Sequence, residues 1–342
     1  MADLLVEDLA KPFKLHLKDV HSVIIFILDH DVLYGIFSGY AGVKGLTIPQ
    51  ETRFATEVIC VDSLLVDKAL VVQVFVEPQV DLWLARSSTK PDVRAKFRRI
   101  KALVMDEAFW HKSAVFSAVC QIPVLSLRIL DSDKPNLKDA AFAWERMTIE
   151  FNVPLLGRLA AIPDYGQIDL FSDLESEHLG TLSSYISQCL ATRKGDWLSD
   201  PVLAAAAVNP AYAFAVKEEH RWTIDDGGGA VRRVFSKLSW GVPGMLNLLL
   251  DGWERYSSKE GVYAEQVERL SYKAEDPVAF FRHVFETSTL ECDRVFASTA
   301  SKLLCQFAKT SRPPSGATST LPTYAQRKGT TCPLIKARTC LR

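Results

Sequence analysis

Two aspartates end an apolar run near the middle of the chain, in the segment QIPVLSLRILDSDKP, residues 121–135. Carboxylates hold divalent metal ions in phosphoryl-transfer enzymes, where two such ions lie about 4 Å apart. If the run is a buried strand, Asp131 and Asp133 could form a metal-dependent nuclease site together with an acid from elsewhere. A structural role suits the same residues, because Asp133 can cap a following helix or start a turn. Both interpretations are open on these residues alone.

A second candidate is the basic segment RAKFRRIK, which begins at Arg94 and lies on a helix predicted from about 92 to 105. On this helix, Arg94, Arg98 and Lys101 share one face, because they are spaced by four and three residues. Such a face can lie along a phosphate backbone, while the apolar residues between the cations give the helix an inward side. The alternative is an ordinary solvated helix face. The predicted DNA-binding residues of this segment are Arg94, Lys96, Arg98, Arg99 and Lys101.

The third candidate is the C-terminal tail. From Ala308 onward the chain contains seven Lys or Arg residues and no acid, among many Ser, Thr, Pro and Gly residues. This composition predicts a disordered basic arm, and such an arm can hold phosphates by charge alone. A solvated terminus without a partner is the alternative. The predicted DNA contacts in the tail are Lys309, Arg312, Arg327 and Lys328.

Other chemical motifs find little support in the sequence. His30 lies between two aspartates, but adjacent residues on a helix diverge and cannot converge on one ion. No Lys-Ser or Lys-Thr follows the three glycines at 227–229, so they are not a phosphate loop. The seven cysteines form no CxxC pair, which indicates a reducing compartment rather than a zinc finger. The sequence therefore predicts no metal site, no nucleophile-based hydrolase and no small-molecule substrate.

Composition narrows the class of protein further. The chain has 342 residues, 48% of them hydrophobic, and a net charge of -1, so no global charge attracts it to nucleic acid or to a membrane. Its longest apolar runs fall far short of the roughly 20 residues that span a bilayer. We therefore expect a soluble intracellular protein without a membrane partner, whose binding depends on local charge.

Helical periodicity predicts the elements that position these residues. Apolar spacing indicates helices over most of the chain, with Pro12 dividing the first long stretch and a flexible break at 225–230. Asp276 followed by Pro277 is typical of a helix start. The predicted fold class is mainly α. The predicted domain organisation is a helical region over 1–220, a helical continuation over 221–307 and the basic tail over 308–342.

Several ordered stretches resemble one family, the hAT-superfamily transposases. The stretch LLVEDLAKP resembles the leucine-rich helix that follows the family's Cys/His motif, and IPQETRFAT is similar to the start of its "TRFaT…L" helix. Residues 109–147 look like its "FW…P…LR.vD.d.P" block. Residues 200–212 are similar to its "LNP.y" block. The order and separation of these motifs agree over roughly residues 3–310. The matching motif residues are Thr52, Arg53, Phe54, Trp110, Pro123, Arg128, Asp131, Asp133, Asn209 and Pro210.

The resemblance implies a specific architecture. These transposases carry an RNase H-like catalytic fold that is interrupted by a large helical insertion domain, and Asp, Asp and Glu bind the metal ions. The first two acids precede the region that this chain matches, and Ala317 is the best positional match to the Glu. We therefore expect the helical insertion domain with at most a remnant of the RNase H-like α/β core. Within it, Pro123 is expected to break or kink a helix, and Asp131 and Asp133 to cap and turn.

The resemblance also implies a function. A transposase-derived chain without its catalytic half is expected to be inactive and nuclear, with DNA binding or self-association as its role. No cofactor is expected, and Mg²⁺ would be the cofactor only of an active full-length form, if one exists. The alternatives are an interaction or structural protein without affinity for nucleic acid, which would be cytoplasmic, and a metal-dependent nuclease fragment.

Overall fold

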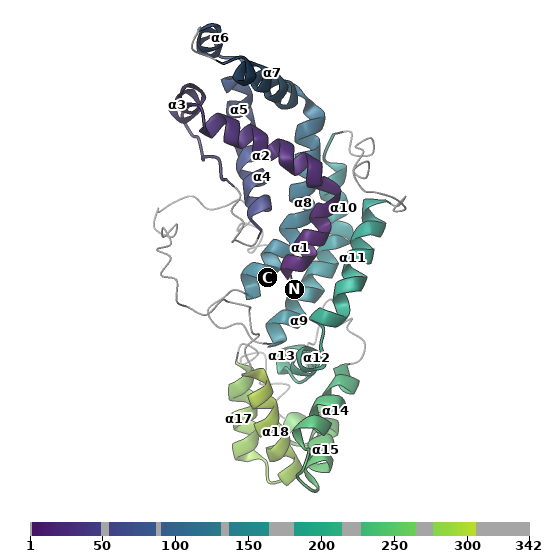
Figure 1. Cartoon of the computed structure of the whole chain (residues 1–342). Coiled ribbons are helices and arrows are strands. Elements are labelled where there is room, and N and C mark those ends of the chain that lie inside the picture. The colour runs from purple at the N-terminus through teal and green to yellow at the C-terminus, as the bar shows by residue number, and fades with distance from the viewer. Residues whose placement is uncertain are drawn as a thin grey trace. The chain divides into compact units, whose positions relative to one another are not determined.

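The structure is a computed structural model that describes residues 2–48, 55–86, 90–130, 137–163, 181–213, 227–264 and 276–305. Residues 1–308 form one compact unit, and residues 309–342, outside the described ranges, form the other. Every regular element in the described ranges is helical, which confirms the mainly α prediction (Figure 1). An RNase H-like remnant and a relation to the transposase insertion domain stay predictions.

The N-terminal and central elements lie between residues 2 and 151. They are α1 (Ala2–Ala10), η1 (Lys11–Phe13), α2 (Lys14–Leu28), α3 (Asp31–Gly39), α4 (Thr56–Val66), α5 (Lys68–Val74), α6 (Pro78–Ala85), α7 (Pro91–Met105), α8 (Glu107–Leu130) and α9 (Leu137–Phe151). Pro12 interrupts the first stretch with a single 3₁₀ turn, as expected from its missing N–H.

The remaining helices lie between residues 153 and 304. They are α10 (Val153–Ala160), α11 (Leu182–Trp197), α12 (Asp200–Ala207), α13 (Pro210–Ala213), α14 (Gly227–Leu238), α15 (Met245–Ser257), α17 (Pro277–Thr287) and α18 (Glu291–Leu304). Asp276 caps α17 by accepting hydrogen bonds from the N–H groups of Val278 and Ala279, so the predicted N-cap is confirmed.

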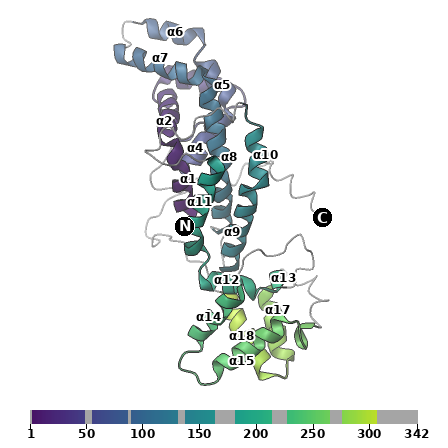
Figure 2. The same ribbon diagram turned by 90° about the vertical axis from the view of Figure 1, so that its right-hand side faces the viewer.

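Helix α8 is the central element of the first group. Helices α1, α4 and α9 pack along it, and α11 contacts α1 and α9 (Figure 2). Pro123 lies inside α8, which continues to Leu130, so the helix is not broken at this proline, and a kink there stays a prediction. The proline is buried, and packing on several sides offsets the loss of one backbone hydrogen bond.

The three glycines at 227–229 are helical rather than a flexible break, because α14 begins at Gly227. The small residue has a packing role. A Cβ atom added at Gly227 would lie 3.1 Å from Cβ of Ala207, at the end of α12. The glycine therefore allows the start of α14 to approach α12, a contact that composition alone did not indicate.

Helices α14, α15, α17 and α18 enclose an aromatic core. The ring of Phe296 on α18 has five aromatic neighbours with ring centroids 5.2 to 6.3 Å away: Phe235, Trp253, Tyr256, Tyr263 and Phe281. Gly252 brings α15 against α18, since a Cβ atom there would lie 2.6 Å from the carbonyl oxygen of Cys292. The close approach of the two helices therefore requires glycine at this position.

Within the described ranges, no single helix is long and apolar enough to cross a membrane. One bent pair reaches that length and apolarity only when residues 4–28 and 31–39 are counted together, across an angle of 89°. The apolar side chains of this pair include Val20, Ile24 and Leu33, all of which are buried in the core.

Candidate nucleic-acid interface

Helix α7 carries the predicted basic segment, and its apolar residues explain how it is held. Pro91 occupies the first helical position, where its fixed φ and missing N–H are favourable. Phe97, Ile100 and Val104 are buried on one side. The ring of Phe97 packs between those of Phe26 and Phe75, at centroid distances of 6.3 and 5.4 Å. The predicted helix with one inward face is therefore confirmed.

The five cations of α7 do not form one uniform face. Arg99 donates to the Asp19 carboxylate on α2 at 2.7 Å, and Nζ of Lys96 lies 5.6 Å above the ring of Phe26 on the same helix. These two side chains therefore contribute to the contact between α7 and α2. An exposed ion pair of this kind is worth at most about 1 kcal/mol.

The other three cations belong to the face predicted from their spacing. Arg94 is half-buried and donates through Nη2 to the carbonyl oxygen of Arg86 at 2.8 Å. Lys101 extends over the ring of Phe97 on its own helix, with Nζ 5.8 Å from the centroid. Arg98 is exposed, and no carboxylate of the described residues lies within ion-pair distance of it. Arg98 is thus the cation most available to a ligand.

Two further cations lie beside this face and were not among the predicted residues. Arg86 ends the turn after α6, and Lys90 is the N-cap of α7. Both are exposed. Their positions before the helix could have been recognised in the sequence, because the stretch from 86 to 101 holds seven Lys or Arg residues and a single acid, Asp92.

Many of the sequence-predicted residues lie outside the described ranges. This group comprises the tail cations Lys309, Arg312, Arg327 and Lys328, the motif residues Thr52, Arg53 and Phe54, and the two aspartates Asp131 and Asp133. Their roles in DNA contact, helix capping or metal binding stay predictions. Within the described ranges, no three His, Cys, Asp or Glu side chains are grouped so that they could hold a metal ion.

The other motif residues lie within the described helices or at their ends. Trp110 is buried, and its Nε1–H donates to the carbonyl oxygen of Val104 at 2.8 Å, which ties the start of α8 to the end of α7. Asn209 and Pro210 are buried where α12 gives way to α13. Arg128 is exposed in the last turn of α8. Trp110, Asn209 and Pro210 therefore contribute to packing.

A buried Ser–His pair was missed at the sequence level. His16 Nε2 lies 2.9 Å from Oγ of Ser113, whose hydroxyl donates to the carbonyl oxygen of Phe109 at 3.0 Å. While that hydroxyl donates to Phe109, its oxygen can accept a hydrogen bond from the Nε2–H tautomer of His16. Burial, assisted by Lys112, lowers the pKa of His16 to about 3. The contact joins α2 to α8 in the core.

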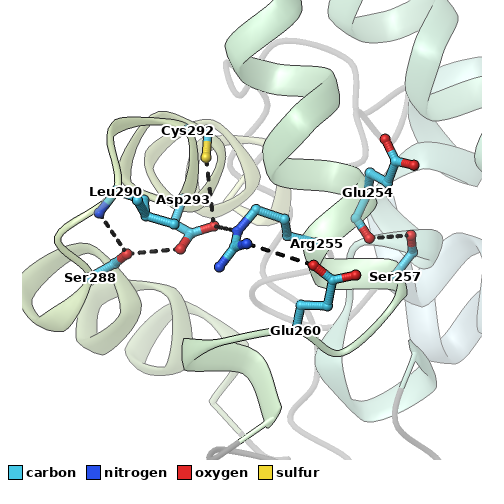
Figure 3. A network of polar contacts seen from close by, with 8 residues as sticks. All are labelled: Glu254, Arg255, Ser257, Glu260, Ser288, Leu290, Cys292 and Asp293. Atoms are coloured by element: carbon cyan, nitrogen blue, oxygen red, sulfur yellow. Dashed lines mark hydrogen bonds and ion pairs between the residues drawn. The ribbon is translucent and has the colours of Figure 1, made fainter.

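Asp293 is the centre of a polar network between α15 and α18 (Figure 3). Its side chain is 1% exposed and accepts hydrogen bonds from Nε of Arg255 at 3.0 Å and from Oγ of Ser288 at 2.8 Å. Arg255 also lies 3.6 Å from Glu260 in the turn after α15. Both carboxylate oxygens are engaged by protein groups, so the network stabilises helix packing and leaves no free carboxylate for chemistry.

A groove of about 410 Å³ along α18 combines apolar and charged side chains. Met245, Phe285 and Val295 contribute the apolar part, and Arg294 and Lys302 contribute cations. The guanidinium of Arg294 lies 5.0 Å above the ring of Phe285. The sequence analysis did not identify this groove, because its lining comes from three separate helices.

Comparison of the chain with models of known protein families, with characterised proteins and with solved structures found no match in any of the three. The resemblance to transposases therefore rests on the sequence motifs alone.

Proposed function

We propose that this protein is a helical, non-catalytic binding protein that contacts the phosphate backbone of nucleic acids through α7 and the neighbouring cations Arg86 and Lys90. One observation carries the proposal. Seven cations and one acid lie between residues 86 and 101 of a chain whose net charge is -1. Such a concentration creates a local positive potential, which is the electrostatic basis of sequence-independent binding to nucleic acid.

The contacts of α7 support this assignment. Its buried side fixes the helix on α2 and on Phe75, so the outward cations are presented on a rigid element. Arg99 is ion-paired with Asp19, whereas no carboxylate of the described residues is within ion-pair distance of Lys96, Arg98 or Lys101. These three cations can neutralise phosphates without first breaking an internal ion pair.

We also propose that the chain derives from a hAT-superfamily transposase. The support is the series of ordered motifs together with the helical structure around Trp110 and Asn209. This derivation favours DNA over other polyanions and a nuclear location over a cytoplasmic one. It assigns no chemistry to the described residues.

Binding should be measured by fluorescence anisotropy with a labelled 20-base-pair duplex at several salt concentrations. We expect the affinity to fall steeply with salt, with a log–log slope of about -3 if Lys96, Arg98 and Lys101 each contact a phosphate. The double variant Arg98→Glu, Lys101→Glu should bind more weakly and reduce that slope by about 2. The matched control is Lys194→Glu, which reverses an exposed cation on α11 and should bind as the wild type does.

Absence of duplex binding at low salt, or equal binding by the double variant, would reject this function. The groove along α18 favours one second candidate, a protein-interaction role without affinity for nucleic acid. The net charge of -1 also suits that candidate. It predicts no duplex binding at any salt concentration.

A further inference from the structure

The turn between α14 and α15 presents an apolar tip to the solvent. Trp240 is 89% exposed, and its neighbours Leu238 and Val242 are 57% and 49% exposed. An aromatic side chain of this size buries about 150–250 Å² when it is packed. Leaving it in water forgoes that stabilisation, and exposed apolar groups that lie together commonly mark a binding surface.

The turn is ordered by its own backbone. The N–H of Ser239 donates to the carbonyl oxygen of Phe235 at 2.9 Å, and the N–H of Val242 donates to that of Ser239 at 3.0 Å. Gly241 and Gly244 have φ values of 80° and 76°, which glycine adopts at no steric cost. The exposure of Trp240 is therefore a property of a defined turn that holds the indole outward.

The surroundings of the tip are cationic. Residues 227–250 contain Arg232, Arg233 and Lys237 and no acid. Asp200 on α12 accepts a hydrogen bond from Arg233 at 2.9 Å and also interacts electrostatically with Lys237. Arg232 and Lys237 are exposed. The tip thus combines a free aromatic face with cations that Asp200 only partly neutralises.

We propose that this tip binds single-stranded nucleic acid, with a base stacked on the indole of Trp240 and phosphates held by Arg232 and Lys237. Aromatic stacking combined with cations is how proteins hold single strands without sequence preference. A duplex offers no free base face at this position, because its bases are already stacked. The inference rests on the proposed function in assigning a nucleic-acid ligand, but it uses a different surface and names the strand form.

The experiment is a titration of the full chain with a twelve-residue oligo-dT, followed by tryptophan fluorescence and by anisotropy of the labelled strand. The chain has seven tryptophans, of which Trp110, Trp144 and Trp197 are buried, so the quenching that belongs to Trp240 is the part lost in the Trp240→Leu variant. We expect Trp240→Leu to weaken binding by about 5- to 150-fold and to abolish most of the quenching. Trp240→Phe keeps a ring and should weaken binding less.

Val66→Ala is the matched control, because it trims an apolar side chain that is 65% exposed on α4, outside the tip; it should bind as the wild type does. Circular dichroism should show unchanged melting for all three variants, since these side chains are exposed. Equal oligo-dT affinity of wild type and Trp240→Leu would overturn the inference. Trp240-dependent binding to phosphatidylserine vesicles without oligo-dT binding would also overturn it and assign a lipid surface instead.

The two proposals fail separately. If the α7 double variant binds duplex as the wild type does, while oligo-dT binding depends on Trp240, the proposed function is rejected and the inference stands. If the α7 variant loses duplex binding while Trp240→Leu binds oligo-dT normally, the inference is rejected and the proposed function stands.

Discussion

The helices around α8 and the helices around α18 both combine buried polar pairs with aromatic contacts, but only around α18 does one ring, that of Phe296, contact five others among the described residues. Buried polar groups join helix pairs in the first region, where His16 meets Ser113 and Asp8 pairs with Arg193. In the second region, aromatic rings surround Phe296. Polar pairs specify which helices meet but make stability depend on pH. A ring cluster concentrates stability in a few side chains.

The largest expected effect is a loss of stability when one ring is removed from the aromatic cluster around Phe296. Phe296→Ala should lower the free energy of unfolding by about 3–5 kcal/mol, because it removes a buried ring that touches five others. Phe97→Ala, with two ring neighbours among the described residues, should fall at the lower end of the same range. Urea unfolding followed by circular dichroism measures both variants. Equal losses would show that ring neighbours do not set the difference.

The second effect tests the polar region through pH. The pKa of His16 is about 3 in the folded protein, against about 6.5 in an unfolded chain. The unfolded state therefore binds more protons between these values, so stability is fully present above pH 6.5 and is lost as pH falls toward 3. Between pH 7 and pH 5 we expect a loss of about 2 kcal/mol from this group.

Urea unfolding of wild type and His16→Gln at pH 7 and pH 5 isolates that contribution. The variant should be less stable at pH 7, because a buried side chain has changed, but its stability should fall less between the two pH values. His21→Gln is the control, since His21 is partly exposed and pairs with Glu57. An unchanged pH dependence in the His16 variant would contradict the assignment.

The smallest expected effect is a gain of stability from a substitution in the turn that follows α15. Lys259 has a φ of 58°, a left-handed conformation in which a Cβ atom is unfavourable. The N–H of Glu260 donates to the carbonyl oxygen of Arg255 at 2.9 Å, as in a glycine-ended helix. Lys259→Gly should therefore raise the free energy of unfolding by up to about 1 kcal/mol.

Thermal melts compare this variant with Lys18→Gly, which places glycine inside α2. That control should lose about 1 kcal/mol, because glycine is a poor helix former. Destabilisation of both variants would mean that the turn does not require the left-handed conformation at Lys259.

The sequence predicted helices better than their interruptions. The cap at Asp276 and the end of α7 just before Asp106 follow from local chemistry and were confirmed. Pro123 carries an equally clear local signal, yet it lies inside α8, and the three glycines at 227–229 form the first turn of α14. Neighbouring helices decide these cases, because packing free energy exceeds the cost of one proline or glycine.

In the candidate site, too, some features follow from the local sequence and others depend on distant elements. The concentration of cations in α7 and its inward side were evident from residue order, because charge and helical periodicity are local properties. The ion pair between Arg99 and Asp19 was not evident from the sequence, because the two residues are 80 positions apart.

By itself, the sequence determined a mainly helical protein with two basic segments, residues 94–101 and the tail from Ala308. Only the tertiary structure decided which side chains are covered. Trp110 and Trp240 are the same residue type, yet one is buried and the other is 89% exposed. Burial depends on which distant elements pack over a position, and that information is not carried by its neighbours in the chain.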